Sequence, residues 1–297
     1  RRPAGAAPAR ASMTLQLLQL LTASIVLPPA PLVIVGPGCQ STQLLTAKLA
    51  AARGHRVQVV TRTVDVQNSN RLMYGTSEPP EFRPLFSCQN SQIASALGAA
   101  EGMILSVAGG KAPPTTSGIG TMMPYMPRVR RIVLLSAIGG STGNTGGLGE
   151  GELIMRCEEE VRAAAAGVEV CTVRVGVLKG GAAVGEQTTG LDEAAFYASL
   201  SAGGYPTPSQ QCAKLYDRQT LGVSVRAGDA IEARNAALRS STRTSAEPRA
   251  DDVSRIVAAG ALLAALRHEA PLELSLSAEA GDQPPSESEW DQTLLHL

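Results

Sequence analysis

A β-branched strand that runs directly into glycine constrains this chain more than any other feature. Residues 31 to 36 are Pro-Leu-Val-Ile-Val-Gly, and residues 40 to 53 place apolar side chains at helical spacing up to Gly54. Residues 57 to 61 alternate as a second strand. The unit is therefore strand, helix, strand, and two strands joined by a helix lie parallel in one sheet.

The turn between the first strand and the helix has the composition of a phosphate-binding loop. Residues 36 to 41, Gly-Pro-Gly-Cys-Gln-Ser, fit G-x-G-x-x-G with serine at the third glycine. The first two glycines allow a close approach of a pyrophosphate, whose charge faces the helix N-terminus. The motif therefore predicts dinucleotide binding, and a Rossmann-like fold that has lost its cofactor is the alternative. The predicted contacts are Gly36, Gly38, Cys39, Gln40 and Ser41.

The end of the second strand favours one nucleotide. An acid at this point accepts the ribose hydroxyls of NAD, whereas an arginine pairs with the 2′-phosphate of NADP. The residues here are Thr61-Arg62-Thr63. We therefore expect NADP(H), with Arg62 as its phosphate contact; an ordinary solvated arginine is the alternative.

The alternation of strands and helices continues along the chain. Strands are expected over 102–110, 131–136, 168–175 and 272–276, and helices over 91–99, 152–166 and 251–266. Residues 139–151, with seven glycines, are expected to form a mobile loop. The carboxyl ends of parallel strands share one edge of a sheet, where ligands bind. This edge is predicted to collect Gly36, Arg62, Gly109, Ser136 and Gly176.

Four segments differ in composition. Residues 1–30 are a transit-like or surface-helix extension, because they hold basic residues and no acid, and the apolar run 13–27 is too short to span a membrane. An interfacial anchor, and so peripheral membrane association, stays open for that run. Residues 31–185 are the NAD(P)-binding Rossmann-like core, 186–277 a small cap with a closing helix and strand, and 278–297 an acidic tail. In that tail Trp290, Leu294 and Leu297 share one helix face, which requires an apolar groove on this domain or on a partner.

The remaining composition excludes several classes of site. Aromatic residues make up 3% of the chain, which argues against nucleic-acid binding by base stacking. Five cysteines without a Cys-x-x-Cys pair, and three scattered histidines, predict neither a disulfide framework nor a metal site. Cys157 and Cys171 are expected in the core, and adjacent Glu158 and Glu159 on a solvated helix face.

The order of these segments resembles the atypical short-chain dehydrogenase/reductase family, especially its NmrA-like branch and related plastid NAD(P)-binding proteins. The resemblance covers roughly residues 31 to 277, and its segments are 33–36, 53–57, 133–136, 158–162, 172–178 and 249–253. It implies an α/β fold with a doubly wound parallel sheet and a small C-terminal cap. The family commonly uses G-x-x-G-x-x-G, which places Cys39 and Thr42 at glycine positions.

The family's catalytic pair is missing. Its reductases usually use Tyr-x-x-x-Lys, in which lysine lowers the pKa of tyrosine, and none of the five tyrosines here has a lysine four residues later. Ser136 stands at the family's strand-end serine, and without a tyrosine we interpret its hydroxyl as a structural hydrogen-bonding group. No catalytic residue is assigned, and whether the chain is an enzyme stays open.

Two functions follow as hypotheses. The first is an NAD(P)-binding scaffold, assembly factor or accessory subunit of an organellar complex, photosynthetic or respiratory, without dehydrogenase activity. The plastid stroma or thylakoid surface is the preferred location and the mitochondrion the second. The alternative is an NADPH-dependent reductase or isomerase of a small organic molecule, with Tyr197 or Tyr205 of the cap as proton donor. Residues 122–131, with three methionines and three arginines, are a candidate docking surface or an ordinary edge of the core.

Overall fold

The computed structural model describes residues 31–36, 41–60, 66–75, 85–87, 90–107, 121–145, 150–165, 167–181, 190–192, 195, 220–230 and 252–297. Several predicted features lie outside these residues: the segment 13–27, Gly38, Cys39, Gln40, Arg62, Gly109, Tyr197 and Tyr205, together with the side chain of Ser41.

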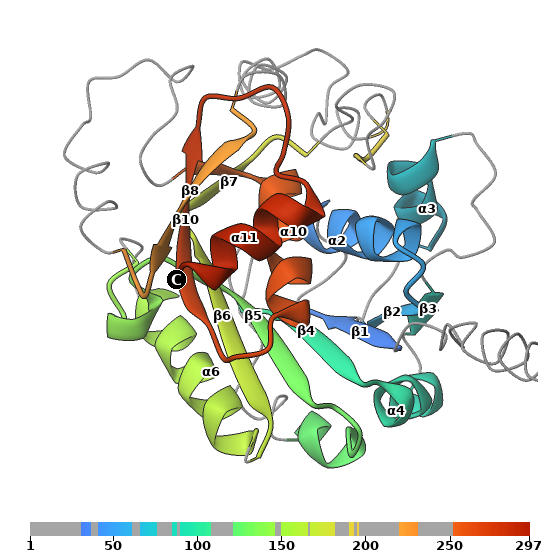
Figure 1. The fold of residues 1–297 in the computed structure, drawn as a ribbon. Helices are drawn as coiled ribbons and strands as arrows, with labels where there is room; N and C mark the ends of the chain where they lie inside the picture. Colours follow the sequence, from blue (N-terminus) through green and yellow to red (C-terminus); the bar gives the residue numbers. More distant parts are fainter. Residues whose placement is uncertain are drawn as a thin grey trace, which may run out of the picture.

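The described residues form one large, mostly parallel sheet (Figure 1). Its eight strands have the order β3-β2-β1-β4-β5-β6-β10-β8, and only the edge strand β8 runs antiparallel. This confirms the predicted Rossmann-like α/β fold. The bounds are β1 Leu32–Val35, β2 Val57–Val60, β3 Leu85–Ser87, β4 Gly102–Ser106, β5 Arg131–Ala137, β6 Glu169–Val175, β8 Gly222–Ala227 and β10 Glu273–Glu279. Two short strands, β7 (Val177–Lys179) and β9 (Asp252–Ser254), pair with each other in a separate parallel ladder.

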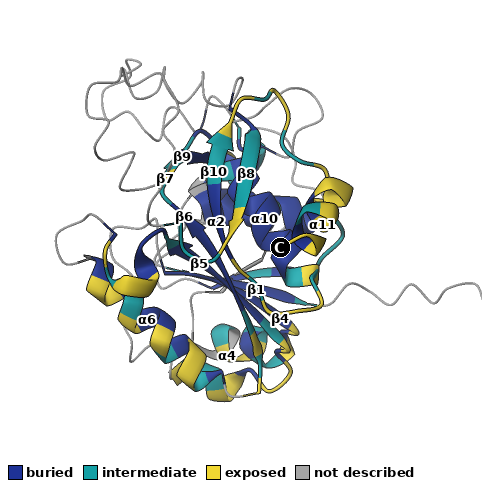
Figure 2. Cartoon of the chain, turned by 60° about the vertical axis from the view of Figure 1, so that its left-hand side comes forward, coloured by how far each residue is buried: buried dark blue, intermediate teal, exposed yellow. Residues whose placement is uncertain are grey.

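Helices cover both faces of the sheet, and each face has its own apolar cluster (Figure 2). In β1, Leu32 and Ile34 belong to one cluster, and Val33 and Val35 belong to the other. This alternation explains why the strand is apolar throughout, as expected for a strand buried on both sides. The first face carries α2 (Ser41–Ala52), α3 (Val66–Tyr74), α10 (Arg255–Arg267) and α11 (Glu287–Leu295), and the second carries α4 (Asn90–Ala99), η1 (Met123–Tyr125) and α6 (Glu150–Ala164).

The C-terminal helix α11 packs on α10, in which residues 256–265 are all buried. Trp290 is 1% exposed and Leu294 is also buried, whereas Leu297 is exposed. A Cβ atom on Gly260 of α10 would lie 2.8 Å from Nε1 of Trp290, so the glycine makes room for the indole. The expectation that the tail's apolar side chains find a groove on their own domain is confirmed for Trp290 and Leu294.

Polar contacts fix the same helix in place. Ser286 caps α11 with its side chain and forms a capping box with Glu289. Arg267 at the end of α10 donates to Asp291 at 2.8 Å. Within the described residues, no helix has the length and apolarity that a membrane span requires.

Replacing Trp290 with alanine should destabilise the domain strongly. The change leaves a large cavity between α10 and α11, and we expect it to lower the free energy of unfolding by about 3–5 kcal/mol. Urea denaturation followed by far-UV circular dichroism measures the effect. Leu295→Ala on the same helix is the matched control: its side chain is 75% exposed, and its effect should stay within about 0.5 kcal/mol. Equal effects of the two variants would contradict this packing.

Candidate functional site

The topology places the candidate site where β1 and β4 lie side by side. β1 pairs with β2 on one side and with β4 on the other, so the order of strands along the chain reverses at this point. Open α/β sheets bind ligands beyond the carboxyl ends of the strands at such a switch point. Gly36 follows β1, Ser106 ends β4, Ser136 lies near the end of β5, and Gly176 follows β6. The described members of the predicted rim are therefore on one edge.

Gly36, at the switch point, lies close to the side chain of Gln43 in α2. A Cβ atom on Gly36 would lie 1.6 Å from Nε2 of Gln43 and 3.2 Å from Cβ of Ser106. Gln43 belongs to the first turn of α2 and is 5% exposed. The glycine after β1 therefore makes room for the Gln43 amide, in addition to the ligand approach that the motif predicts. Sequence reasoning missed Gln43, because a polar residue in a first helical turn is too common to be a signal.

Two buried threonines lie where α2 packs against the sheet. Thr42 and Thr46 of α2 are buried, and Thr46 Oγ1 donates to the carbonyl oxygen of Thr42 at 2.7 Å. A cavity of about 10 Å³ remains among these side chains, Gln43, Ser106 and the apolar residues Ile34, Ile104, Leu135 and Leu262. A space of this size holds one water at most. The interface of α2 with the sheet is therefore filled by protein atoms.

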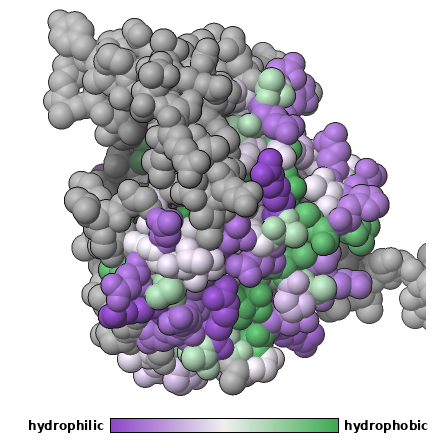
Figure 3. All heavy atoms as spheres, turned by 90° about the vertical axis from the view of Figure 1, so that its left-hand side faces the viewer, coloured by the Kyte–Doolittle hydropathy of each residue, from purple (hydrophilic) through white to green (hydrophobic). Residues whose placement is uncertain are grey.

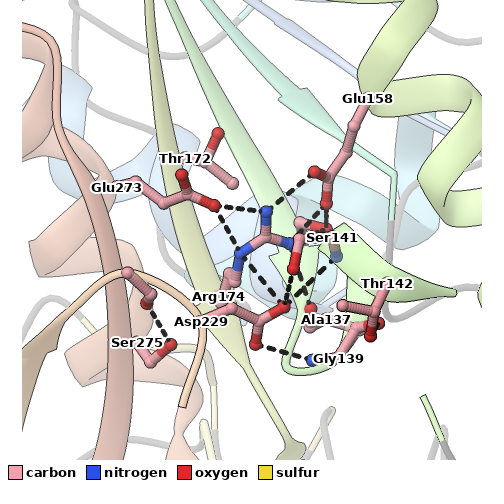
Figure 4. Close-up of polar contacts among 12 residues, drawn as sticks. Ala137, Gly139, Ser141, Thr142, Glu158, Thr172, Arg174, Asp229, Glu273 and Ser275 are labelled. Carbon is pink, nitrogen blue, oxygen red and sulfur yellow. Dashed lines mark hydrogen bonds and ion pairs between the residues drawn. The ribbon is translucent and has the colours of Figure 1, made fainter. Parts of the chain in front are cut away.

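Charged side chains gather around the buried guanidinium of Arg174 in β6 (Figure 4). Its guanidinium is fully buried and forms a bidentate ion pair with the Glu158 carboxylate of α6. Nη1 donates to Oε1 at 2.5 Å, and Nη2 donates to Oε2 at 2.8 Å. Nη2 also donates to Oε1 of Glu273 on β10 at 2.6 Å, and Nε lies 3.6 Å from Oδ2 of Asp229. We call Ser136, Glu158, Arg174, Asp229 and Glu273 the Arg174 cluster.

The carboxylate partners of Arg174 keep its guanidinium protonated. Burial alone would lower the pKa of its guanidinium, but the hydrogen bonds and charges of Glu158, Glu273 and Asp229 outweigh burial and raise the pKa above the ordinary value. Bidentate pairing of this kind is the strongest ion-pair geometry available to arginine. The prediction of a solvated face is therefore wrong for Glu158, which is buried, and right for Glu159, which is exposed.

Ser136 belongs to this cluster rather than to a surface. Its side chain is 0% exposed, and its hydroxyl donates to Oε1 of Glu158. Nη1 of Arg174 approaches the same hydroxyl oxygen at 3.4 Å. The hydroxyl at the family's strand-end position is thus held inside the protein. The assignment of Gly36, Ser41, Ser136 and Gly176 to cofactor binding stays a prediction.

Asp229 connects the cluster to the glycine-rich turn after β5. Its Oδ1 accepts from Gly139 N at 2.7 Å, and its Oδ2 accepts from the hydroxyl of Ser141 at 2.7 Å. The hydroxyl of Ser275 on β10 donates to the carbonyl oxygen of Gly228 and accepts from Ala230 N, which fixes the backbone on both sides of Asp229. Residues 139–145 form a turn around η2 (Gly140–Thr142) that these contacts hold, and residues 146–149 of the predicted loop lie outside the described residues, so its mobility stays a prediction.

The helix that faces Ser136, α6, carries neither a tyrosine nor a lysine among its fifteen residues. Its inward face consists of Ile154, Cys157 and Val161 beside Glu158. Burial, with Glu160 and Glu158, raises the pKa of the Cys157 thiol and keeps it protonated. Cys157 and Cys171 are both buried and free of disulfides, so their prediction as core residues is confirmed. Within the described ranges no three His, Cys, Asp or Glu side chains are grouped as a metal would require.

The sequence matches no family model and no curated protein. Among solved structures, it is similar to a short-chain dehydrogenase/reductase from Veillonella parvula in complex with NADP, with 14% identity over 86% of this chain and 99% of that chain and a TM-score of 0.49. A yeast methylglyoxal/isovaleraldehyde reductase complexed with NADPH is 10% identical over 83% of this chain and 75% of that chain, with a TM-score of 0.48. A putative epimerase from Bacteroides thetaiotaomicron is 10% identical over 86% and 99% of the two chains, with a TM-score of 0.45. At these identities the likeness concerns the fold alone.

Breaking the ion pair of the Arg174 cluster should be costly. Glu158→Ala leaves the Arg174 guanidinium buried without its main partner, and we expect a loss of about 3–5 kcal/mol in the free energy of unfolding. The neighbouring Glu159→Ala removes an exposed carboxylate and should change it by no more than about 0.5 kcal/mol. Chemical denaturation of both variants provides the comparison. A small effect at Glu158 would mean that the pair does not hold β6 to α6.

Proposed function

We propose that this chain binds NADP(H) and serves as a scaffold, assembly factor or accessory subunit of an organellar protein complex, without dehydrogenase activity. The preferred setting is the plastid stroma or thylakoid surface, in a photosynthetic or respiratory complex, with the mitochondrion second. The observation that supports this most is the burial of Ser136 in the Arg174 cluster.

A group that exchanges a proton with a substrate has to come within about 2.6–3.2 Å of it. The Ser136 hydroxyl is fully buried and already donates to Glu158, which comes from the same helix that would carry tyrosine and lysine in a reductase of this fold. Opening the position would expose Arg174 and Glu158 and break their fork. The position is thus built for stability, which favours a binding role over turnover.

The nucleotide part of the proposal rests on the switch point. The N-terminus of α2 faces this edge, and a helix N-terminus attracts a diphosphate. The strand ends at Gly36 and Ser106 would border the nucleotide, and Gly36 presents no side chain to it. NADP and NADPH are bound in two of the similar structures, and NADP(H) is also the nucleotide that Arg62 predicts. When bound, it would supply a hydride donor, but the proposed role uses it as a ligand.

A partner surface is supported by the segment 122–130. Tyr125 is 57% exposed, Met122 and Met123 are half-buried, and Arg128 and Arg130 are exposed. Two members of the predicted patch are excluded from it: Met126 is buried, and the Arg131 guanidinium pairs with Glu169. The remaining five residues combine an apolar contact area with positive charge, which suits an acidic protein surface.

The side of the molecule that carries α6 and β8 is a weaker candidate (Figure 3). Its described residues mix hydrophilic side chains with a strip of hydrophobic ones. Leu153 of α6 is exposed as a single large apolar residue. Such mixtures are ordinary for protein surfaces, so segment 122–130 is the docking surface that we propose.

Nucleotide binding is tested by calorimetric titration of the purified protein with NADPH and NADH. We expect micromolar binding of NADPH, weaker binding of NADH, and loss of the NADPH preference in Arg62→Ala, because the 2′-phosphate then lacks its cation. NADPH consumption is followed in parallel with a panel of aldehydes, ketones and enones, and none is expected. Turnover that depends on Tyr197 or Tyr205 would establish the alternative, a reductase. No binding of either nucleotide would overturn the cofactor assignment.

The partner role is tested by affinity purification of the tagged chain from plastids. We expect it to co-purify with subunits of one complex and to lose them in the double variant Tyr125→Ser, Arg130→Glu, which removes the apolar and the charged contact together. Leu295→Ser, at another exposed apolar residue, should retain the complex. Recovery of the same subunits with the double variant would contradict this docking surface.

A further inference from the structure

We propose that the chain has a second ligand site, a pocket at the amino-terminal edge of the sheet that binds a small zwitterion with an apolar body, of the size of an amino acid. Arg130 binds the carboxylate of this ligand, and Glu101 binds its ammonium group. The pocket lies at the edge of the sheet opposite the switch point, so it does not depend on the proposed nucleotide binding.

The pocket has a volume of about 360 Å³ and lies where four adjacent strands begin. The first residues of β1, β4, β5 and β6 all line it. Its apolar wall consists of Pro31, Leu32 and Leu266. Sites for small organic molecules have volumes of roughly 300–1,000 Å³ and combine apolar walls with a few charged groups. The pocket therefore suits a compact organic molecule better than an inorganic ion.

Two of the three arginines that line the pocket are already neutralised. Arg131 pairs with Glu169, which also lines the pocket. Arg267 donates to Asp291 of α11 at 2.8 Å, and its Nη1 atom lies 3.7 Å from a carboxylate oxygen of Glu287. These pairs form the border of the pocket and leave its charge preference to the remaining residues.

Arg130 and Glu101 are the arginine and the carboxylate of the pocket that form no ion pair with any described residue. Their backbones lie side by side, because Arg130 N donates to the carbonyl oxygen of Glu101 at 3.0 Å. Both side chains are exposed, and no ion pair joins them. One unpaired charge of each sign therefore lines the same pocket, which matches a ligand that carries both charges.

The helix ends at this edge add to the attraction for an ammonium group. α2 ends at Ala52, α4 at Ala99 and α10 at Arg267, and each helix leads into a residue that lines the pocket or ends at one. The C-terminus of a helix carries a partial negative charge, which attracts cations and repels anions. An anion alone would meet this repulsion, and a cation alone would leave Arg130 unpaired. A zwitterion complements both features.

The experiment compares three probes that share a phenylethyl body, in saturation-transfer NMR titrations of the full chain at low ionic strength. L-phenylalanine carries both charges, phenylpropionate carries the carboxylate alone, and phenethylamine carries the ammonium group alone. We expect L-phenylalanine to bind with a millimolar or lower dissociation constant, about fivefold below that of either analogue, which is the scale of one exposed ion pair. Added salt should weaken this preference, because it screens exposed charges.

Two variants assign the charges to their residues. Glu101→Gln should bind L-phenylalanine about fivefold more weakly and phenylpropionate no more weakly than the wild type does. Arg130→Gln should weaken L-phenylalanine by the same factor and leave phenethylamine binding intact. The retained analogue shows in each case that the pocket is still folded. Glu159→Gln and Arg226→Gln, at exposed residues that do not line the pocket, are the matched controls and should bind all three probes as the wild type does.

The outcomes that overturn the proposal are distinct. Absence of L-phenylalanine binding up to about 10 mM removes the site. Equal binding of L-phenylalanine and phenylpropionate means that the pocket selects an anion, and equal binding of all three probes means that it selects no charge. An unchanged preference in both variants places the binding elsewhere. Arg130 also belongs to the proposed docking surface, whereas Glu101 does not, so the result for Glu101→Gln concerns the pocket alone.

Discussion

The buried charge of Arg174 is the constraint on which the rest of this structure depends. A guanidinium in the middle of the sheet is tolerable only when carboxylates surround it, because an unpaired buried charge is very costly. Its partners come from α6, from β10 and from the turn after β8. One side chain of β6 therefore fixes the position of a helix on one face, of the next strand, and of the chain that leaves the edge strand.

The same constraint decides what the carboxyl end of β5 can do. Ser136 pairs with Arg174 in the register of β5 and β6, so its hydroxyl meets the cluster directly. Asp229, held by the same guanidinium, in turn fixes the backbone of Gly139 and Ser141 just beyond that strand. The strand end at Ser136 is therefore part of the interior.

The sequence predicted the strands and helices of the core because β-branched runs and helical spacing mark them directly, and their ends differ from the observed ones by a few residues at most. It did not predict α3 or the strands β3, β7, β8 and β9. Of these, β3, β7 and β9 have three residues each, too few for a periodic pattern. Glu158 was assigned to the solvent because spacing along a helix cannot show a partner on another strand. The available signal was Arg174 itself, a charge within an apolar strand. Gln43 had no such signal, since its contact with Gly36 arises from tertiary packing.

At two strand ends of the rim, a side chain of a neighbouring helix contacts the residue at the end of the strand. At β1 the amide of Gln43 fills the space beside Gly36, and at β5 the carboxylate of Glu158 takes the Ser136 hydroxyl. The first contact is made by a neutral amide in the first turn of α2. The second contact involves a charged carboxylate of the Arg174 cluster. Displacing it would break the ion pairs that join β6 to α6 and β10. The end of β1 is therefore held by the packing of neutral groups, and the end of β5 is held by charge.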